Sequence, residues 1–161
     1  MNGFEAHESS GTMNIHRSLL LLAACSVFTL TGSGAPPMGV TLDVVLFNYL
    51  DRPIFDVYID GKAGDSSDPY PATGGGTIAG VGLTSGPKKI SWRLDGPPGT
   101  PRNGETVHAR NSPRLDNVPR EARYLSMHIY PDETVELVVS THYPRATDKG
   151  RASASHRPED P

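Results

Sequence analysis

The chain has 161 residues and a formal net charge of −3, so it lacks the excess of positive charge that nucleic-acid binding requires. Its 17 glycines and 15 prolines indicate many turns between short strands rather than long helices. The only cysteine, Cys25, lies near the N-terminus, which excludes intrachain disulfides, cysteine-ligated zinc and a cysteine nucleophile in the rest of the chain. A single domain is expected from this length.

Residues 1–33 have the pattern of an export leader. Ser18–Leu30 is an apolar run of signal-peptide length, too short to span a membrane as a helix. Met13 opens a short basic segment before this run, so residues 1–12 could be an over-extended start. The leader predicts an exported protein.

Two cleavage patterns compete within the leader. Leu22–Cys25 matches a bacterial lipobox, which makes Cys25 a candidate for lipidation. Gly32–Ala35 offers the small residues that an ordinary signal peptidase prefers, and a second lipobox would end at residue 33 if Ser33 were a cysteine. Both alternatives remain open at this stage.

The remainder divides into a tether at 34–40, a β-rich domain at 41–144 and a polar tail at 145–161 that is expected to be disordered. The domain begins with two strands, Thr41–Leu50 and Ile54–Asp60, joined at a turn. The first has apolar residues on both faces, which predicts a strand covered on both sides. The second alternates apolar and polar residues, which predicts one buried and one wet face.

Two further strands are expected in the middle of the domain. Thr77–Leu83 contains interior glycines, which predict a bulge or a close neighbour. Lys88–Asp95 alternates cleanly, with Ile90, Trp92 and Leu94 facing inward. Trp92 is the only tryptophan, and we expect a core anchor rather than a platform for a ligand.

The last strands form a hairpin, Tyr124–Tyr130 with Thr134–Tyr143, preceded by a short polar strand at 105–111 that suits a sheet edge. In the expected register three apolar pairs share one face: Leu125 with Val139, Met127 with Leu137, and Ile129 with Val135. The opposite face pairs His128 with Glu136, and a cross-strand ion pair is preferred over a catalytic pair.

Six or seven strands with short connections predict an all-β fold, a single antiparallel β-sandwich that is Ig-like in general architecture. Asp60, Asp65 and Asp68 raise the question of calcium, but their spacing fits no EF-hand, so a solvated loop is expected. Gly74–Gly76 precedes a strand rather than a helix, which argues against a phosphate cradle. No cofactor and no metal site are expected.

Several segments, in this order and spacing, resemble a family of small Gram-negative lipoproteins that is known by its domain of unknown function. These segments are Asn48–Ile54, Val57–Gly61, Gly74–Gly76, Ile90–Leu94, Gly99–Glu105 and His128–Glu136. Many relatives carry a Cys-Cys pair after the glycine run, where this chain has Ile78–Val81, and the family usually has a lipobox cysteine.

Many members of this family are similar to periplasmic immunity proteins of phospholipase effectors of the type VI secretion system. The resemblance therefore implies a periplasmic protein that binds and occludes a phospholipase toxin, with membrane attachment only through a lipid anchor. The alternative is an envelope protein or lipoprotein that binds a glycan or another envelope protein. An enzyme is not expected, because His108, His128 and His142 show no spacing typical of a nucleophile or metal site.

Two loops rich in glycine and proline are the expected toxin-binding surface. Lys62–Gly76 presents Tyr70 and Gly96–Gly104 presents Arg102, and both residue types are favoured as interface anchors. Rigid loops lose little conformational entropy when they bind.

Overall fold

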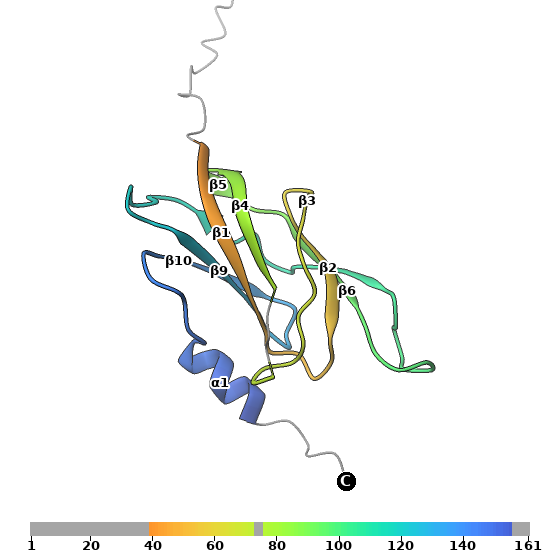
Figure 1. The fold of residues 1–161 in the computed structure, drawn as a ribbon. Helices are drawn as coiled ribbons and strands as arrows, with labels where there is room; N and C mark the ends of the chain where they lie inside the picture. The colour runs from red at the N-terminus through yellow and green to blue at the C-terminus, as the bar shows by residue number, and fades with distance from the viewer. Residues whose placement is uncertain (1–38, 73–75, 156–161) are drawn as a thin grey trace, which may run out of the picture. The chain divides into compact units, whose positions relative to one another are not determined.

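The computed structural model describes residues 39–72 and 76–155, which form strands in sheets and one short helix (Figure 1). The expected all-β class is therefore confirmed. The leader at 1–33, Cys25 and residues 34–38 of the expected tether lie outside the described residues. Within the described ranges, no helix has the length and apolar character needed to cross a membrane.

The described part contains ten strands, of which seven have three or more residues, and one helix. The elements are β1 (Gly39–Asn48), β2 (Ile54–Ile59), β3 (Lys62–Ala63), β4 (Thr77–Thr84), β5 (Gly86–Pro87), β6 (Ile90–Leu94), β7 (Thr106–His108), β8 (Arg114–Leu115), β9 (Tyr124–Ile129), β10 (Val135–Ser140) and α1 (Asp148–Ser155). The first strand thus begins inside the segment expected to be a tether.

Two four-stranded sheets carry the fold. Sheet A has the order β10-β9-β1-β4, sheet B has the order β3-β2-β6-β7, and β5 pairs with β8 separately. Strand β1 pairs antiparallel with β4 but parallel with β9, so the prediction of a wholly antiparallel arrangement is wrong. Strands β1 and β2 lie in different sheets, and the short connection between them therefore leads from sheet A to sheet B (Figure 1).

The predicted register of the last hairpin is confirmed, because Leu125 lies opposite Val139 and Ile129 opposite Val135. The predicted bulge is also present: the β1–β4 register shifts between Leu42 and Val44. Opposite this shift, Gly80 has a φ of 68°, a left-handed conformation that glycine adopts without steric cost. Strand β7 lies at the edge of sheet B, as its polar sequence predicts.

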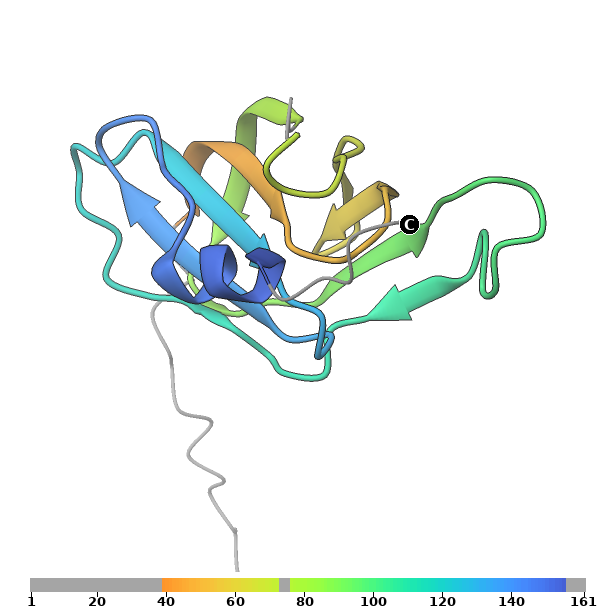
Figure 2. The same ribbon diagram turned by 90° about the horizontal axis from the view of Figure 1, so that it is seen from below.

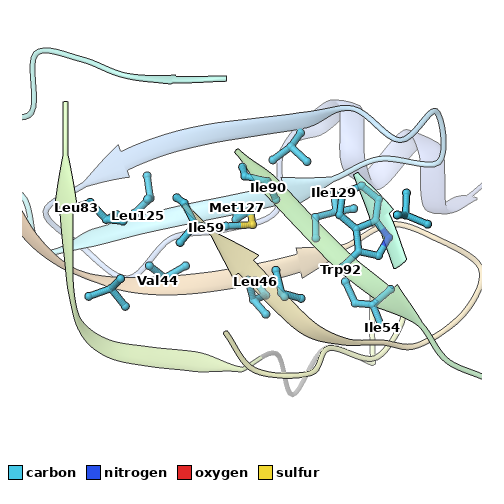
Figure 3. Packing of buried hydrophobic residues seen from close by; sticks show 14 of the residues in the cluster. Val44, Leu46, Ile54, Ile59, Leu83, Ile90, Trp92, Leu125, Met127 and Ile129 are labelled. Carbon is cyan, nitrogen blue, oxygen red and sulfur yellow. The ribbon is translucent and has the colours of Figure 1, made fainter. Parts of the chain in front are cut away.

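The main core is a cluster of buried aliphatic side chains and Trp92, and it draws residues from both sheets (Figure 3). Val44 and Met127 come from sheet A, whereas Ile59 and Trp92 come from sheet B. Trp92 is fully buried, which confirms its predicted place as a core anchor. Each such side chain contributes roughly 1.5–3 kcal/mol when it is withdrawn from water.

A second cluster, the aromatic cluster, lies on the opposite face of β1 and consists of Val45, Phe47, Tyr49 and Tyr130. Helix α1 lies beside sheet A (Figure 2), and the backbone N–H of Thr147, directly before this helix, donates to the Tyr49 hydroxyl of the cluster. A Cβ added at Gly150 would overlap the Tyr49 ring, so glycine is required for this close approach.

The expectation of a disordered tail at 145–161 is therefore wrong for Asp148–Ser155, which form α1. Thr147 caps this helix, because its hydroxyl oxygen accepts a hydrogen bond from the Gly150 N–H at 3.0 Å. Asp148 adds negative charge to the first turn, where the helix dipole favours it. The remaining residues, 156–161, lie outside the described part.

Candidate functional site

A cavity of about 490 Å³ lies where β1 leads into β2. Its walls come from six places in the chain: the β1–β2 connection, β6, β7, the β6–β7 loop, the β9–β10 turn and α1. The lining residues are Tyr49, Leu50, Asp51, Arg52, Trp92, Leu94, Arg102, Val107, Pro131, Glu133 and Ser153. The volume falls in the range typical of pockets for small molecules.

Arg52 is held in place beside this cavity by two backbone carbonyls. Its Nε donates to the Asp95 oxygen and its Nη1 to the Pro101 oxygen, both at 2.7 Å. The third group, Nη2, is buried and has no hydrogen-bond partner among the described residues. The guanidinium is thus fixed in orientation, and one of its donor groups is buried without an acceptor among the described residues.

Trp92 contributes a second donor of this kind. Its side chain is fully buried and lines the cavity, and its indole Nε1 has no hydrogen-bond partner among residues 39–72 and 76–155. Buried tryptophan N–H groups usually find a partner, and an unsatisfied buried donor costs about 1–3 kcal/mol. The core anchor predicted from sequence is therefore also a wall of the cavity.

Arg102, one of the two predicted toxin-binding residues, lies on the rim of the cavity. It bonds Glu105 at 2.9 Å and Glu133 at 3.2 Å, and Arg110 contacts the same Glu133 at 3.1 Å. These contacts connect the β6–β7 loop to the β9–β10 turn, and they raise the pKa of Arg102 while lowering that of Glu105. Arg102 remains half exposed, so it is both fixed and accessible.

Tyr70, the other predicted residue, belongs to a different place. Its ring lies edge-on to Tyr49 with 5.6 Å between centroids, and its backbone N–H donates to the Asn48 carbonyl. The side chain is partly buried against the aromatic cluster and does not line the cavity. Arg102 therefore lines the cavity and Tyr70 does not, although Tyr49 lines the cavity and also contacts the Tyr70 ring.

A chain of hydrogen bonds runs through the aromatic cluster. The Tyr49 hydroxyl lies 3.0 Å from His128 Nδ1, and His128 Nε2 lies 2.9 Å from the Ser126 hydroxyl. Ser126 donates its proton to the Val138 carbonyl, so its oxygen accepts from the Nε2–H of His128. Nδ1 then accepts from the Tyr49 hydroxyl, whose own oxygen accepts from the Thr147 N–H.

Burial lowers the pKa of His128 from its ordinary 6.5 to about 4, so the imidazole is neutral near pH 7. The expected ion pair with Glu136 is therefore wrong, although the predicted register does place the two residues opposite each other. Glu136 instead accepts a 2.6 Å hydrogen bond from Tyr130, and burial together with this bond raises the pKa of that phenol.

The Ser126–His128 contact does not have the arrangement of a nucleophile and its base. A general base must accept the serine proton, whereas here Ser126 donates to a backbone carbonyl and accepts from the imidazole. Both side chains are also about 1 % exposed, so a substrate cannot reach them without rearrangement. This pair stabilises the packing of sheet A.

Of the three aspartates that raised the question of calcium, Asp60 forms an ion pair with a lysine instead. Asp60 accepts a 2.7 Å hydrogen bond from the buried amine of Lys88, and the hydrogen bonds from Lys88 and Lys89 outweigh burial and lower the pKa of this carboxyl. Within the described ranges, no group of three or more His, Cys, Asp or Glu side chains could hold a metal ion.

Comparison of the chain with known protein families, with curated proteins and with solved structures finds no match. The sequence analysis named Arg102, which lines the cavity, but did not name Arg52, which lines it as well. The signal was weak, because Arg52 lies in a three-residue turn between two apolar strands. Its position depends on the pairing of Ile54 with Leu94, which brings the turn against Asp95 and the β6–β7 loop.

Proposed function

We propose that this protein is a periplasmic immunity protein that binds a secreted phospholipase toxin and blocks it by occlusion. The resemblance of its sequence to small Gram-negative lipoproteins provides the class of partner and the compartment. The observation that carries the proposal is the cavity at the β1–β2 junction, because it joins a fixed charged rim to buried donors without partners. The proposal includes an Ig-like sandwich of the two sheets and an anchor lipid on Cys25.

The rim of this cavity has the properties of a preorganised binding surface. Arg102 is held by Glu105 and Glu133 before any partner arrives, so little conformational entropy is lost when it binds. Arginine is among the residue types that most often dominate protein interfaces. The loop that carries it, Gly96–Gly104, is also restricted by its prolines.

Binding rather than chemistry is favoured by the protonation pattern of the aromatic cluster. Ser126 and His128 are the serine and histidine in hydrogen-bond contact there, and their proton arrangement opposes nucleophilic attack. We expect no hydrolysis of phospholipid or of the toxin by the isolated protein. Turnover that persists in a Ser126→Ala variant would locate a catalytic site elsewhere, and any turnover would contradict occlusion as the mechanism.

The test is calorimetric titration of a phospholipase encoded beside this chain with wild-type protein and with Arg102→Ala. We expect the substitution to weaken binding by about 1–2 kcal/mol, a factor of about 5–30, without lowering the melting temperature. Arg114→Ala is the matched control, since Arg114 is exposed, forms its one ion pair among the described residues with Asp116, and lies outside the cavity. Equal affinity of the Arg102 and Arg114 variants would contradict this placement of the interface.

A second candidate is an envelope protein that binds a glycan or another envelope component. The size of the cavity favours it, because about 490 Å³ suits a small ligand as well as the tip of a protein loop. Titration with the phospholipase separates the two candidates, since only an immunity protein should inhibit the lipase at equimolar concentration.

A further inference from the structure

Helix α1 and the residue before it contact two tyrosines of the aromatic cluster. The Tyr49 hydroxyl accepts a hydrogen bond from the Thr147 N–H at 3.1 Å, and the Tyr49 ring lies against Gly150. The Tyr130 hydroxyl lies 2.9 Å from that of Thr147, and the Lys149 amine lies 3.7 Å from the centroid of the Tyr130 ring. These contacts concentrate the attachment of α1 on two phenol rings.

Apolar burial contributes little to this attachment. The sequence of α1 contains two alanines and one glycine but no larger apolar residue, and Gly150 is its buried residue. A helix without an apolar stripe gains little from burial, and elements with few apolar contacts open locally at low free energy. Helix α1 therefore has the properties of an element that can detach while the sheets stay folded.

Detachment of α1 would change the cavity at the β1–β2 junction. Ser153 of α1 lines this cavity, and so does Tyr49, against which α1 packs at Gly150. Helix α1 thus forms part of the wall beside Tyr49. Whatever controls the attachment of α1 to Tyr49 therefore controls access to this side of the cavity.

The neutral form of His128 is built into the attachment. Its Nδ1 accepts the Tyr49 proton at 3.0 Å, and the Tyr49 oxygen accepts from the Thr147 N–H. Its Nε2 already donates to the Ser126 hydroxyl, so an added proton must go to Nδ1. The imidazolium then donates to Tyr49, whose own proton must turn away from Nδ1. It turns toward Thr147, which contacts the same hydroxyl, donates to it and caps α1.

The charged and titratable groups of the surrounding elements are Tyr49 on β1, Tyr70 on the loop beside it, Tyr130 after β9, Glu136 on β10, and Asp148, Lys149 and Arg151 on α1. Glu136 lies opposite His128 and attracts an imidazolium, but its carboxylate already accepts the Tyr130 proton. Lys149 adds a positive charge over the Tyr130 ring. Burial outweighs the attraction of Glu136, so the closed arrangement disfavours the charged form of His128.

We propose that α1 is an acid-released cover of the cavity: a proton on His128 disrupts the Tyr49–Thr147 contact, α1 detaches, and the cavity opens beside Tyr49. The step transfers one proton from solvent to Nδ1 and changes no other covalent bond. The sheets stay folded, because the main core contains no residue of α1. The inference goes beyond the proposed function, since it concerns access to the cavity in the isolated protein, whatever its partner.

Amide hydrogen exchange of the full chain tests the proposal. The protection factor of the α1 amides, corrected for the intrinsic exchange rate at each pH, should fall at least tenfold between pH 7 and pH 5. The reason is that His128 in the released state takes up its proton near the ordinary pKa of 6.5. In His128→Gln the factor should change by less than about twofold. His142→Gln removes an exposed histidine from the segment before α1 and should respond like the wild type.

The emission of Trp92, the sole tryptophan, separates release of α1 from global unfolding. Its side chain is fully buried in the main core, so the emission should keep the wavelength of a buried indole between pH 7 and pH 5. A shift to the wavelength of an exposed indole over this range would contradict the proposal, because the core would then open together with α1.

Gly150→Val gives a reciprocal measurement that does not depend on the folding of His128→Gln. The added side chain overlaps the Tyr49 ring and forces α1 away from it, so the pKa of His128 should rise from about 4 toward 6.5. Titration of the imidazole resonances by NMR measures this pKa, and Ala152→Val on the exposed side of α1 should leave it unchanged. The proposal is overturned by an unchanged pKa in Gly150→Val, or by equal pH dependence of α1 protection in wild type and His128→Gln.

Discussion

Strand β1 contributes to two clusters of opposite character. Its inward residues, such as Val44 and Leu46, join the main core, which is aliphatic apart from Trp92. Its outward residues, Phe47 and Tyr49, join the aromatic cluster, where hydroxyl and imidazole groups are hydrogen-bonded in series. The main core leaves the indole donor of Trp92 without an acceptor among the described residues, whereas the Tyr49 and Tyr130 hydroxyls of the aromatic cluster are hydrogen-bonded.

The two clusters therefore stabilise the fold by different interactions. The main core depends on apolar area and packing, which change little with pH. The aromatic cluster depends on the neutral form of a buried histidine and on single hydrogen bonds. Its contribution to the free energy of unfolding can therefore be reduced by acid or by deletion of one hydroxyl group. Each of the following experiments tests this contrast.

The largest effect is expected for Trp92→Ala, which opens a cavity in the main core. We expect a loss of about 3–5 kcal/mol in the free energy of unfolding, measured by urea denaturation. The loss should be the same at pH 5 and pH 7, because no titrating group of the aromatic cluster is involved. A loss of only a few tenths of a kcal/mol would show that Trp92 does not anchor the core.

Acid should act on the aromatic cluster through His128. The unfolded chain takes up this proton near pH 6.5 and the folded chain only near pH 4, so the unfolded state binds more protons in between. The contribution is complete above pH 6.5 and is lost as the pH falls to 4, by about 3 kcal/mol in total.

The measurement is the free energy of unfolding against pH for wild type and His128→Gln. The wild-type curve should fall more steeply than the His128→Gln curve between pH 6.5 and 4, because only the wild type carries this histidine. The carboxylates of the two proteins are the same and contribute equally to both curves. His108→Gln, which removes an exposed histidine from β7, serves as the control and should parallel the wild type. Parallel curves for all three proteins would contradict the buried neutral imidazole.

Gly150→Val tests whether α1 is part of the aromatic cluster. A side chain at this position would overlap the Tyr49 ring, so α1 must move away or the ring must shift. We expect a loss of about 1–3 kcal/mol in thermal or urea unfolding. Ala152→Val on the exposed side of α1 is the control for helix propensity, and an equal effect of both variants would argue against the close approach.

The smallest effect is expected for Tyr130→Phe, which removes one hydroxyl and keeps the ring. This hydroxyl donates to Glu136 and contacts Thr147 at 2.9 Å, so its removal should cost about 1–2 kcal/mol. Tyr143→Phe removes a hydroxyl from an exposed ring and should change the free energy of unfolding by less than about 0.5 kcal/mol. Similar losses of unfolding free energy in the two variants would contradict a stabilising role of the Tyr130 hydroxyl.

The elements that could be predicted are those with period-two alternation along the strand. Leu125 and Ile129 determine the register of the last hairpin because a slip by one residue would expose them. The same parity that turns Ile90 and Trp92 inward also turns Lys88 inward, where the structure pairs it with Asp60. Neither this buried lysine nor its pairing with Asp60, which lies directly after β2, was predicted from the sequence.

The segment that covers the aromatic cluster, α1, could not be predicted from alternation of apolar and polar residues. The apolar pattern of β1 predicted that both of its faces are covered, yet α1 has no apolar stripe that would mark it as the cover. Its contact depends on an absent side chain at Gly150 and on a backbone donor at Thr147. The cavity depends similarly on Arg52, whose position follows from sheet topology rather than from local sequence.

The parallel pairing of β1 with β9 has a consequence for synthesis of the chain. Tyr49 contacts His128, 79 residues later, and Thr147, 98 residues later, so neither face of β1 is complete until the last part of the chain is available. Contacts of such long sequence separation form slowly. A nascent chain that has released only its first hundred residues therefore holds an unfinished sheet A, which is completed only when β9 and β10 emerge.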